Sequence, residues 1–112
     1  MTLEQVMRQR IKSIRSVIKE KGKQYGSDRD RLYQLNKAAM LLGKTPKQVC
    51  LSYMSKHLTA LMCWIEEDSD ISIEQWEEKI GDSINYLIIL ETLVKKETKN
   101  ETKDATVRHQ DN

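Results

Sequence analysis

The chain has 112 residues, which suits one small domain with a modest hydrophobic core. Its net charge of +2 at pH 7 by itself indicates no class of partner. Its two cysteines, Cys50 and Cys63, lie thirteen residues apart in one expected helix, a distance of roughly 20 Å that is too long for a disulfide bond. No CxxC pair and no His/Cys cluster at zinc-ligand spacing is present, so composition excludes a disulfide framework and argues against a structural metal. We expect both cysteines to be reduced thiols in the core.

The apolar segments are too short to cross a membrane. The longest of them, residues 84–90, is interrupted by Asn85, whereas a spanning helix needs about 20 apolar residues. The first residues include Glu4 and Arg8 in an amphipathic pattern, which differs from the apolar region of a signal peptide. We therefore expect a cytoplasmic protein that makes no membrane contact.

Charge is distributed unevenly along the chain. Residues 1–24 carry seven Lys or Arg against two acids, a balance of +5, whereas residues 66–82 carry eight acids against one lysine, a balance of −7. These two segments can attract each other within one subunit or between subunits, or they can be solvated faces of two helices.

Two helices are expected in the first part of the chain. Residues 3–23 have apolar side chains at helical spacing, in a stripe typical of a packed helix: Leu3, Val6, Met7, Ile11, Ile14, Val17 and Ile18. Ser27 or Asp28 then suits the N-cap of a second helix over residues 29–42, and Gly43 suits its C-cap.

The third helix has the clearest start. Thr45, Pro46 and Gln48 provide a capping residue, a proline at the first helical position and the glutamine that completes a capping box. Apolar residues at helical spacing then continue to about Glu66.

A second capping box, Ser72 with Gln75, starts the fourth helix, which we expect to end near Lys96. Residues 97–112 are polar and lack periodicity, which predicts a disordered tail after a helical domain over residues 1–96. No alternating pattern typical of a strand occurs. The predicted fold class is therefore all-α, a four-helix bundle.

The fourth helix is apolar on two sides. One stripe consists of Ile73, Trp76, Ile80, Ile84, Leu87 and Val94. The nearly opposite side carries Asp82, Tyr86, Ile89 and Leu93. A helix that is apolar on two sides must be buried on two sides. We therefore expect a homo-oligomer, dimer or higher, whose interface, or else a pocket, lies on the second side with Asp82 at its edge.

Two carboxylates on this helix are candidate metal ligands. Glu78 and Asp82 are four residues apart and so share one helix face, with Asn85 close by. Carboxylates placed in this way can hold Mg²⁺ against a phosphate. The alternative is a solvated pair, or an Asp82 that accepts a hydrogen bond from a neighbouring helix.

Two further groups of residues suit an anionic ligand. Lys56 can meet a phosphate, whereas the adjacent His57, about 100° around the helix, is either a phosphate ligand or a satisfied core residue. Residues 21–27 (KGKQYGS) place two lysines, two glycines and a tyrosine at the junction of two helices. Glycine lets backbone N–H groups approach an anion, Lys21 and Lys23 can neutralise it, and Tyr25 can stack on a base; alternatively, the segment is a helix end and a turn.

Other classes of activity lack a signal. No GxSxG motif occurs and neither cysteine lies beside a plausible base, so nucleophilic catalysis is unsupported. The basic first helix has the stripe of a packed helix, which argues against specific DNA binding.

Three stretches together resemble a known family. KGKQYGS (21–27), TPKQVCLSYMSKHLTAL (45–61) and WEEKIGDSINYLIIL (76–90) are similar to phage and bacterial proteins of the nucleotide modification associated domain type. These proteins are related to the all-α MazG-like and dimeric dUTPase-like pyrophosphohydrolases. The resemblance covers roughly residues 3–95 and implies a helical, oligomeric fold that handles nucleotides, in the bacterial host cytoplasm if the protein is phage-encoded.

The sequence departs from the enzymatic pattern of that family. MazG-like enzymes carry ExxE on one helix and ExxD on another, and these acids gather magnesium. Asp82 matches the final aspartate, but Lys79 stands three residues before it, and Lys56 and His57 occupy the region of the other acidic pair. A cationic site can neutralise phosphates without a metal.

We therefore interpret the chain as a nucleotide-binding protein without turnover and without a cofactor, one that could sequester an immune signalling nucleotide. Lysines and His57 would meet phosphates, Tyr25 or Tyr86 would stack on a base, and Asp82 or Asn85 would recognise base or sugar hydroxyls. The residues expected to bind are Lys21, Lys23, Tyr25, Lys56, His57, Asp82, Asn85 and Tyr86.

Two alternatives stay open. One is a Mg²⁺-dependent nucleoside triphosphate pyrophosphohydrolase that uses Glu78 and Asp82, with Glu74 or Glu77 as further acids. The other is a helical interaction module whose fourth helix docks a host protein.

Overall fold

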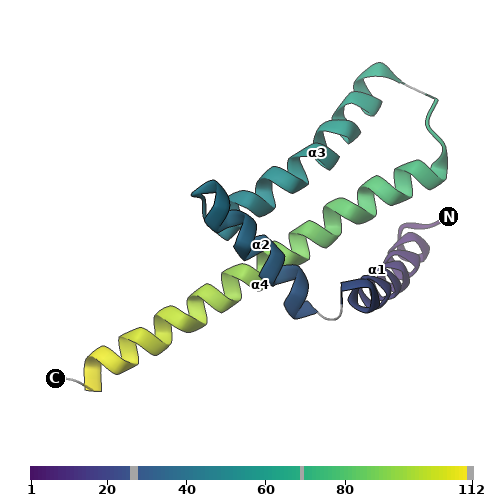
Figure 1. Ribbon diagram of the computed structural model, residues 1–112. Helices are drawn as coiled ribbons and strands as arrows, with labels where there is room; N and C mark the ends of the chain where they lie inside the picture. Colours follow the sequence, from purple (N-terminus) through teal and green to yellow (C-terminus); the bar gives the residue numbers. More distant parts are fainter. Residues whose placement is uncertain (26–27, 69, 111–112) are drawn as a thin grey trace.

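The computed structural model describes the backbone of residues 1–25, 28–68 and 70–110, and the side chains of residues 1–17, 19–20, 32–68 and 70–98. The chain is an all-α helical bundle, as predicted, and its described backbone contains no strand. The described backbone forms four helices, α1 (Leu3–Tyr25), α2 (Asp28–Leu42), α3 (Pro46–Glu67) and α4 (Ile73–Gln110). Helices α3 and α4 lie side by side as an antiparallel pair, α2 crosses α4, and α1 packs on α2 and α4 (Figure 1).

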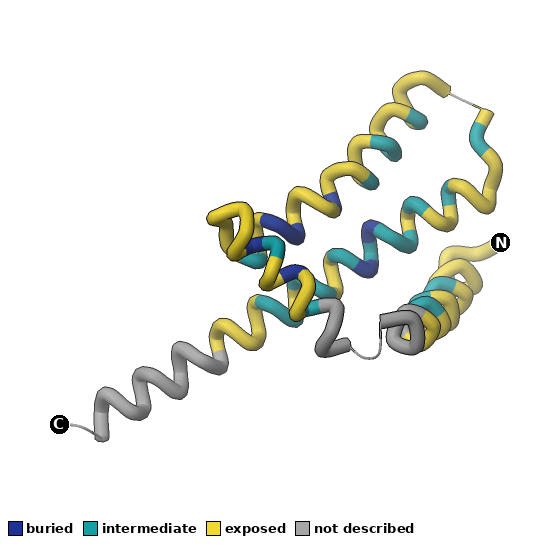
Figure 2. The backbone as a smooth tube through the Cα atoms, viewed as in Figure 1, coloured by how far each residue is buried: buried dark blue, intermediate teal, exposed yellow. Residues whose placement is uncertain are grey.

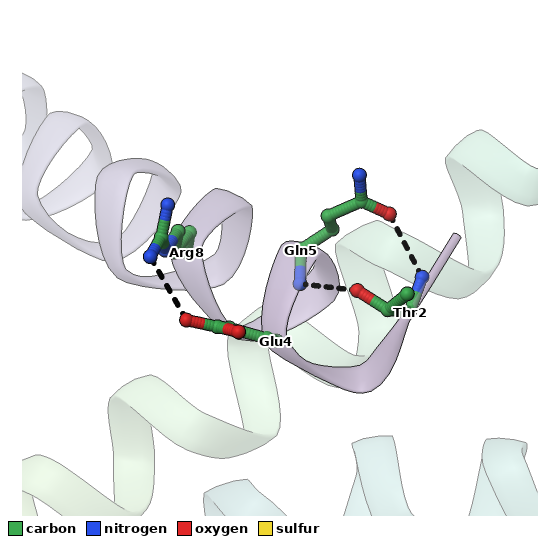
Figure 3. A network of polar contacts seen from close by, with 4 residues as sticks. All are labelled: Thr2, Glu4, Gln5 and Arg8. Atoms are coloured by element: carbon green, nitrogen blue, oxygen red, sulfur yellow. Dashed lines mark hydrogen bonds and ion pairs between the residues drawn. The ribbon is translucent and has the colours of Figure 1, made fainter.

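Reciprocal side-chain caps start three of the helices. In each, a Thr or Ser hydroxyl accepts the backbone N–H of a glutamine three residues later, and the glutamine oxygen accepts the backbone N–H of the cap. The pairs are Thr2 with Gln5, Thr45 with Gln48 and Ser72 with Gln75. The last two confirm the sequence prediction, and Figure 3 shows the first, beside a 2.8 Å ion pair between Arg8 and Glu4.

Left-handed residues end two of the helices. Gly43, at φ 63°, terminates α2, and the Lys44 N–H donates to the Ala39 carbonyl at 2.9 Å, which confirms the predicted C-cap. Asp68, at φ 48°, terminates α3, because an aspartate tolerates this backbone region better than most residues.

The hydrophobic core is small and lies where α2, α3 and α4 meet (Figure 2). Its buried members are Leu35, Ala39, Val49 and Cys50, against which Ala38, Tyr86, Ile89, Leu90 and Leu93 pack. Only one of the two cysteines is part of it, since Cys63 is exposed, so the prediction of two core thiols is wrong for Cys63. Cys63 lies on the solvent side of α3, whereas Cys50 points toward α4 and donates to the Tyr86 carbonyl at 3.4 Å.

Helix α1 contributes no buried side chain among those described. Its apolar stripe, predicted to be packed, is largely open: Leu3 is 87% exposed, Met7 54% and Ile11 47%. Ile18 of this stripe, and Ser27 at the junction with α2, lie outside the described side chains. The stripe is amphipathic as predicted, but one chain does not cover it.

The two apolar sides of α4 have environments opposite to those predicted. The side with Tyr86, Ile89 and Leu93 packs on the core of the same chain, and Asp82 on that side faces α3, so it is not the expected oligomer interface. The other stripe stays open in part, with Ile73 64% exposed, Ile80 38%, Leu87 51% and Val94 44%.

Helix α4 continues to Gln110, beyond the predicted end near Lys96. The sequence after Lys96 lacks an apolar stripe, but it also lacks glycine and proline, the residues that most oppose a helix. Glu97 in addition pairs with Lys47 of α3 at 2.8 Å, which joins this part of α4 to the bundle.

The long α4 makes the molecule elongated (Figure 1). Its principal extents are 63 × 30 × 27 Å and its radius of gyration is 17.8 Å, whereas a compact domain of this length has about 13 Å. None of the described helices has an apolar stretch that could cross a bilayer.

Candidate functional site

The antiparallel packing of α3 and α4 brings three of the predicted site residues, His57, Asp82 and Tyr86, to the contact between these helices, and Asn85 is buried on α4 three residues after Asp82. His57 comes from α3, and Asp82, Asn85 and Tyr86 come from α4. His57 Nδ1 lies 3.7 Å from Asp82 Oδ2, and both side chains are mostly buried, with 20% and 26% exposed. This distance permits an attraction between a protonated imidazole and the carboxylate but is too long for a hydrogen bond.

Aromatic rings surround His57. The imidazole stacks on the Tyr86 ring, with centroids 5.5 Å apart and an angle of 26° between the planes. Tyr53, one turn before His57, tilts against the same Tyr86 ring at 6.3 Å and 59°. One face of Tyr86 is therefore already occupied by a ring of its own chain, so a base could stack on that face only after His57 moves.

Two buried polar atoms, one on α3 and one on α4, lack a hydrogen-bond partner. Among the described residues, His57 Nδ1 and Asn85 Oδ1 are the two buried side-chain atoms in this condition. Asn85 is 5% exposed and lies three residues after Asp82, so the two side chains are neighbours on one side of α4. Because an unsatisfied buried polar group costs about 1–3 kcal/mol, such atoms mark a place where a hydrogen-bond partner is missing.

Two polar side chains near this contact do have hydrogen-bond partners. The Ser83 hydroxyl, 6% exposed, donates to the Lys79 carbonyl at 2.9 Å within α4. Cys50 joins α3 to the Tyr86 carbonyl, and burial raises the pKa of its thiol, so it remains protonated in this bond. The Cys50 bond therefore joins α3 to α4 at Tyr86, whereas the Ser83 bond stays within α4.

The other predicted site residues do not join this group. Lys56 and Glu78 are exposed, and the described residues contain no group of three or more His, Cys, Asp or Glu that could hold a metal ion. The side chains of Lys21, Lys23 and Tyr25 lie outside the described residues.

Sequence reasoning missed Tyr53 in this region and a contact of Arg10 on another side of α4. Tyr53 was not singled out as a site residue, although its position one turn from His57 is a signal that their side chains are neighbours. Arg10 of α1 was assigned only to the basic segment, yet its guanidinium approaches α4 at Gly81: a Cβ built there would lie 2.8 Å from Arg10 Nη1. No signal in the sequence predicts that Arg10 of α1 lies beside Gly81 of α4.

Comparison with known proteins adds no family, because no family model, no curated protein and no solved structure matches this chain. The chemistry of the site therefore rests on its own residues.

Proposed function

We propose that this chain binds a nucleotide and that the nucleoside part lies at the contact between α3 and α4, against His57, Asp82, Asn85 and Tyr86. The observation that carries the proposal is the Asn85 amide oxygen, which is buried and has no hydrogen-bond partner among the described residues. A ligand that supplies a donor there would remove the cost of this orphan atom.

The site offers acceptors, which indicates the kind of group it receives. The Asp82 carboxylate and the Asn85 carbonyl both accept hydrogen bonds, and His57 Nδ1 accepts in one of its two neutral tautomers. Base amino groups, ring N–H groups and sugar hydroxyls are donors, whereas a phosphate is an acceptor. The negative charge of Asp82, 3.7 Å from His57, further favours a nucleoside over a phosphate at this point.

Phosphates would then be met outside the contact. Lys56 is exposed and adjacent to His57 on α3, so its flexible side chain can reach a group that projects from the site. Lys21 and Lys23 are the further cations that we propose for this role, with Tyr25 near them for stacking.

We propose binding without turnover. The group that faces Asp82 across the contact is a histidine, whereas a magnesium site for pyrophosphate cleavage gathers several carboxylate oxygens. A protein that retains an intact nucleotide can lower its free concentration, and sequestration of a signalling nucleotide is the role that we propose on this basis.

The test is retention of nucleotides from a defined pool. Purified protein is mixed with canonical, modified and cyclic nucleotides and Mg²⁺, separated from the free pool by filtration, and the bound fraction is identified by chromatography. An intact retained nucleotide supports the proposal. Conversion of a triphosphate to a monophosphate and pyrophosphate would instead establish the pyrophosphohydrolase, and an empty bound fraction would refute nucleotide binding.

Two variants locate the site. Asn85→Leu removes the orphan acceptor and should abolish retention, whereas Asn36→Leu, at an exposed asparagine of α2, should leave it unchanged. Asp82→Asn keeps the shape but exchanges one acceptor for a donor, and should weaken retention at least tenfold, the effect of about 1.4 kcal/mol. Retention that survives both substitutions would place the ligand elsewhere.

A further inference from the structure

Helix α1 carries a row of cations along one side. Four basic residues recur at helical spacing and so share that side, and they form the cation row: Arg8, Lys12, Arg15 and Lys19. All four are exposed. Arg8 pairs with Glu4 of the same helix at 2.8 Å, whereas the other three form no ion pair with any described residue. The described side chains of α1 carry five cations against two acids, so this helix attracts an anionic surface.

The cation row lies on the side of α1 away from α4. Arg10 approaches α4 at Gly81, and it follows Arg8 by two residues, which places the two arginines nearly opposite each other around the helix. No described side chain of α1 is buried, and Figure 2 shows how little of this helix the rest of the chain covers.

An exposed apolar row borders the cations. Arg8 directly follows Met7, and Lys12 directly follows Ile11, so the two rows lie about 100° apart around α1. Leu3 stands one turn before Met7 in the apolar row. The exposed fractions are 87% for Leu3, 54% for Met7 and 47% for Ile11. The side of α1 that faces solvent is therefore amphipathic, with cations at its edge.

This pattern suits the surface of a negatively charged bilayer better than a nucleic acid. At a bilayer surface, apolar side chains enter the boundary between head groups and acyl chains, and the Lys and Arg beside them reach lipid phosphates. A nucleic acid duplex would engage the cations but leave the apolar row in water. The expectation of no membrane contact considered only spanning segments and signal peptides, and a helix that lies on a bilayer needs neither.

We propose that α1 binds the surface of an anionic lipid bilayer, with Leu3, Met7 and Ile11 inserted and the cation row against lipid phosphates. Since α1 gives no described side chain to the core, this contact leaves the packing of α2, α3 and α4 intact. The surface is separate from the α3–α4 site, and the proposal holds whether or not that site binds a nucleotide.

Cosedimentation with sucrose-loaded vesicles tests the contact. One set of vesicles is phosphatidylcholine alone, and the other contains about one third phosphatidylglycerol, an anionic lipid. The wild-type chain should pellet with the anionic vesicles and stay in the supernatant with the neutral ones. The bound fraction should fall as salt is raised, because salt screens the attraction between the cation row and the lipids.

Lys12→Gln combined with Arg15→Gln tests the cation row. Each cation near an anionic surface strengthens binding about fivefold, so this pair should weaken vesicle binding about 25-fold. The matched control, Lys44→Gln with Lys96→Gln, removes the same charge from exposed lysines outside α1 and should change binding far less. All four side chains are exposed, so the helical circular dichroism should stay unchanged.

Met7→Gln combined with Ile11→Gln tests insertion of the apolar row. Binding to the anionic vesicles should weaken at least tenfold although no charge has changed. The matched control, Met40→Gln with Leu41→Gln, changes side chains that are 82% and 86% exposed at the end of α2 and should leave vesicle binding unchanged.

Four results would overturn the proposal. The first is a wild-type chain that does not pellet with anionic vesicles at low salt, including a chain whose copies cover α1 instead. The second is equal binding to neutral and anionic vesicles. The third is a charge or apolar variant of α1 that binds as well as the wild type. The fourth is a chain that binds a DNA duplex but not the anionic vesicles.

Discussion

Replacing Asn85 by leucine separates the stability of the chain from its proposed ligand binding. The asparagine is 5% exposed, and its Oδ1 has no hydrogen-bond partner among the described residues. Leucine has a similar length and no polar atom, so the substitution removes the unsatisfied oxygen and keeps the position filled. Without ligand the variant should be more stable than the wild type. Addition of the ligand should raise the stability of the wild type but not that of the variant.

The magnitude follows from two contributions. Removal of a buried unsatisfied group should raise the free energy of unfolding by about 1–3 kcal/mol. The higher helix propensity of leucine adds about 0.5 kcal/mol, which the exposed control Asn36→Leu measures by itself. For a chain of this size each kcal/mol corresponds to about 4 °C, so Asn85→Leu should raise Tm by roughly 4–12 °C beyond the control.

Thermal denaturation followed by circular dichroism measures both variants, with and without the retained nucleotide. Because leucine is bulkier, Asn85→Ala is the companion variant that removes the same oxygen without risk of overpacking. A fall in Tm for both Asn85 variants would refute the reasoning, since it would show that the amide already has its partners in the free protein. A nucleotide that stabilises Asn85→Leu as much as the wild type would refute the assigned binding role.

Four further predictions concern caps and cysteines. Thr45→Ala should lower the free energy of unfolding in urea by about 0.5–2 kcal/mol, because it breaks the capping box of α3. The control Thr59→Ala, on the exposed face of the same helix, should change this free energy by less than about 0.5 kcal/mol. Gly43→Ala should cost about 1–2 kcal/mol in the same assay because φ is 63°, although the added Cβ meets nothing within 4 Å. Mass spectrometry after brief alkylation should find exposed Cys63 modified well before buried Cys50, and equal rates would contradict the assigned burial. Burial raises the pKa of Cys50 above 9.0, so the thiol of the unfolded chain loses its proton at a lower pH than that of the folded chain. The free energy of unfolding should therefore fall as pH rises from 9.0 toward the folded pKa, by up to about 1.4 kcal/mol per pH unit. Cys50→Ala should remove this part of the pH dependence.

Local signals in the sequence predicted the helix boundaries where a single short motif determines them. Thr45 with Gln48, Ser72 with Gln75, and Gly43 each act through backbone groups within a few residues, so no tertiary information is needed. The end of α4 lacked such a motif. The apolar stripe is lost near Lys96, which predicts an end there, but a polar segment without glycine or proline can continue a helix that is already formed.

Periodicity predicted which faces are apolar but not what covers them. The two sides of α4 were recognised, yet the sequence did not show that the side with Tyr86 turns inward and that the side with Ile80 stays open. That choice depends on how α1 and α3 dock, which involves residues distant in sequence.

The candidate site shows the same limit. The sequence predicts His57, Asp82 and Tyr86 one by one from their chemistry, and their convergence depends on the register between α3 and α4. The stacking of His57 on Tyr86 could not be predicted, because it requires that register to within one helical turn. Tyr53 was within reach of sequence reasoning, since it lies one turn before His57 on the same helix.

The absence of any buried side chain in the described part of α1 has a consequence for local unfolding. A helix that gives nothing to the core can detach while α2, α3 and α4 remain packed, so its amide protons should exchange with solvent through an opening of lower free energy than those around Val49 and Cys50. In a native-state exchange experiment the α1 amides should therefore lose protection first, before any opening of the core formed by α2, α3 and α4.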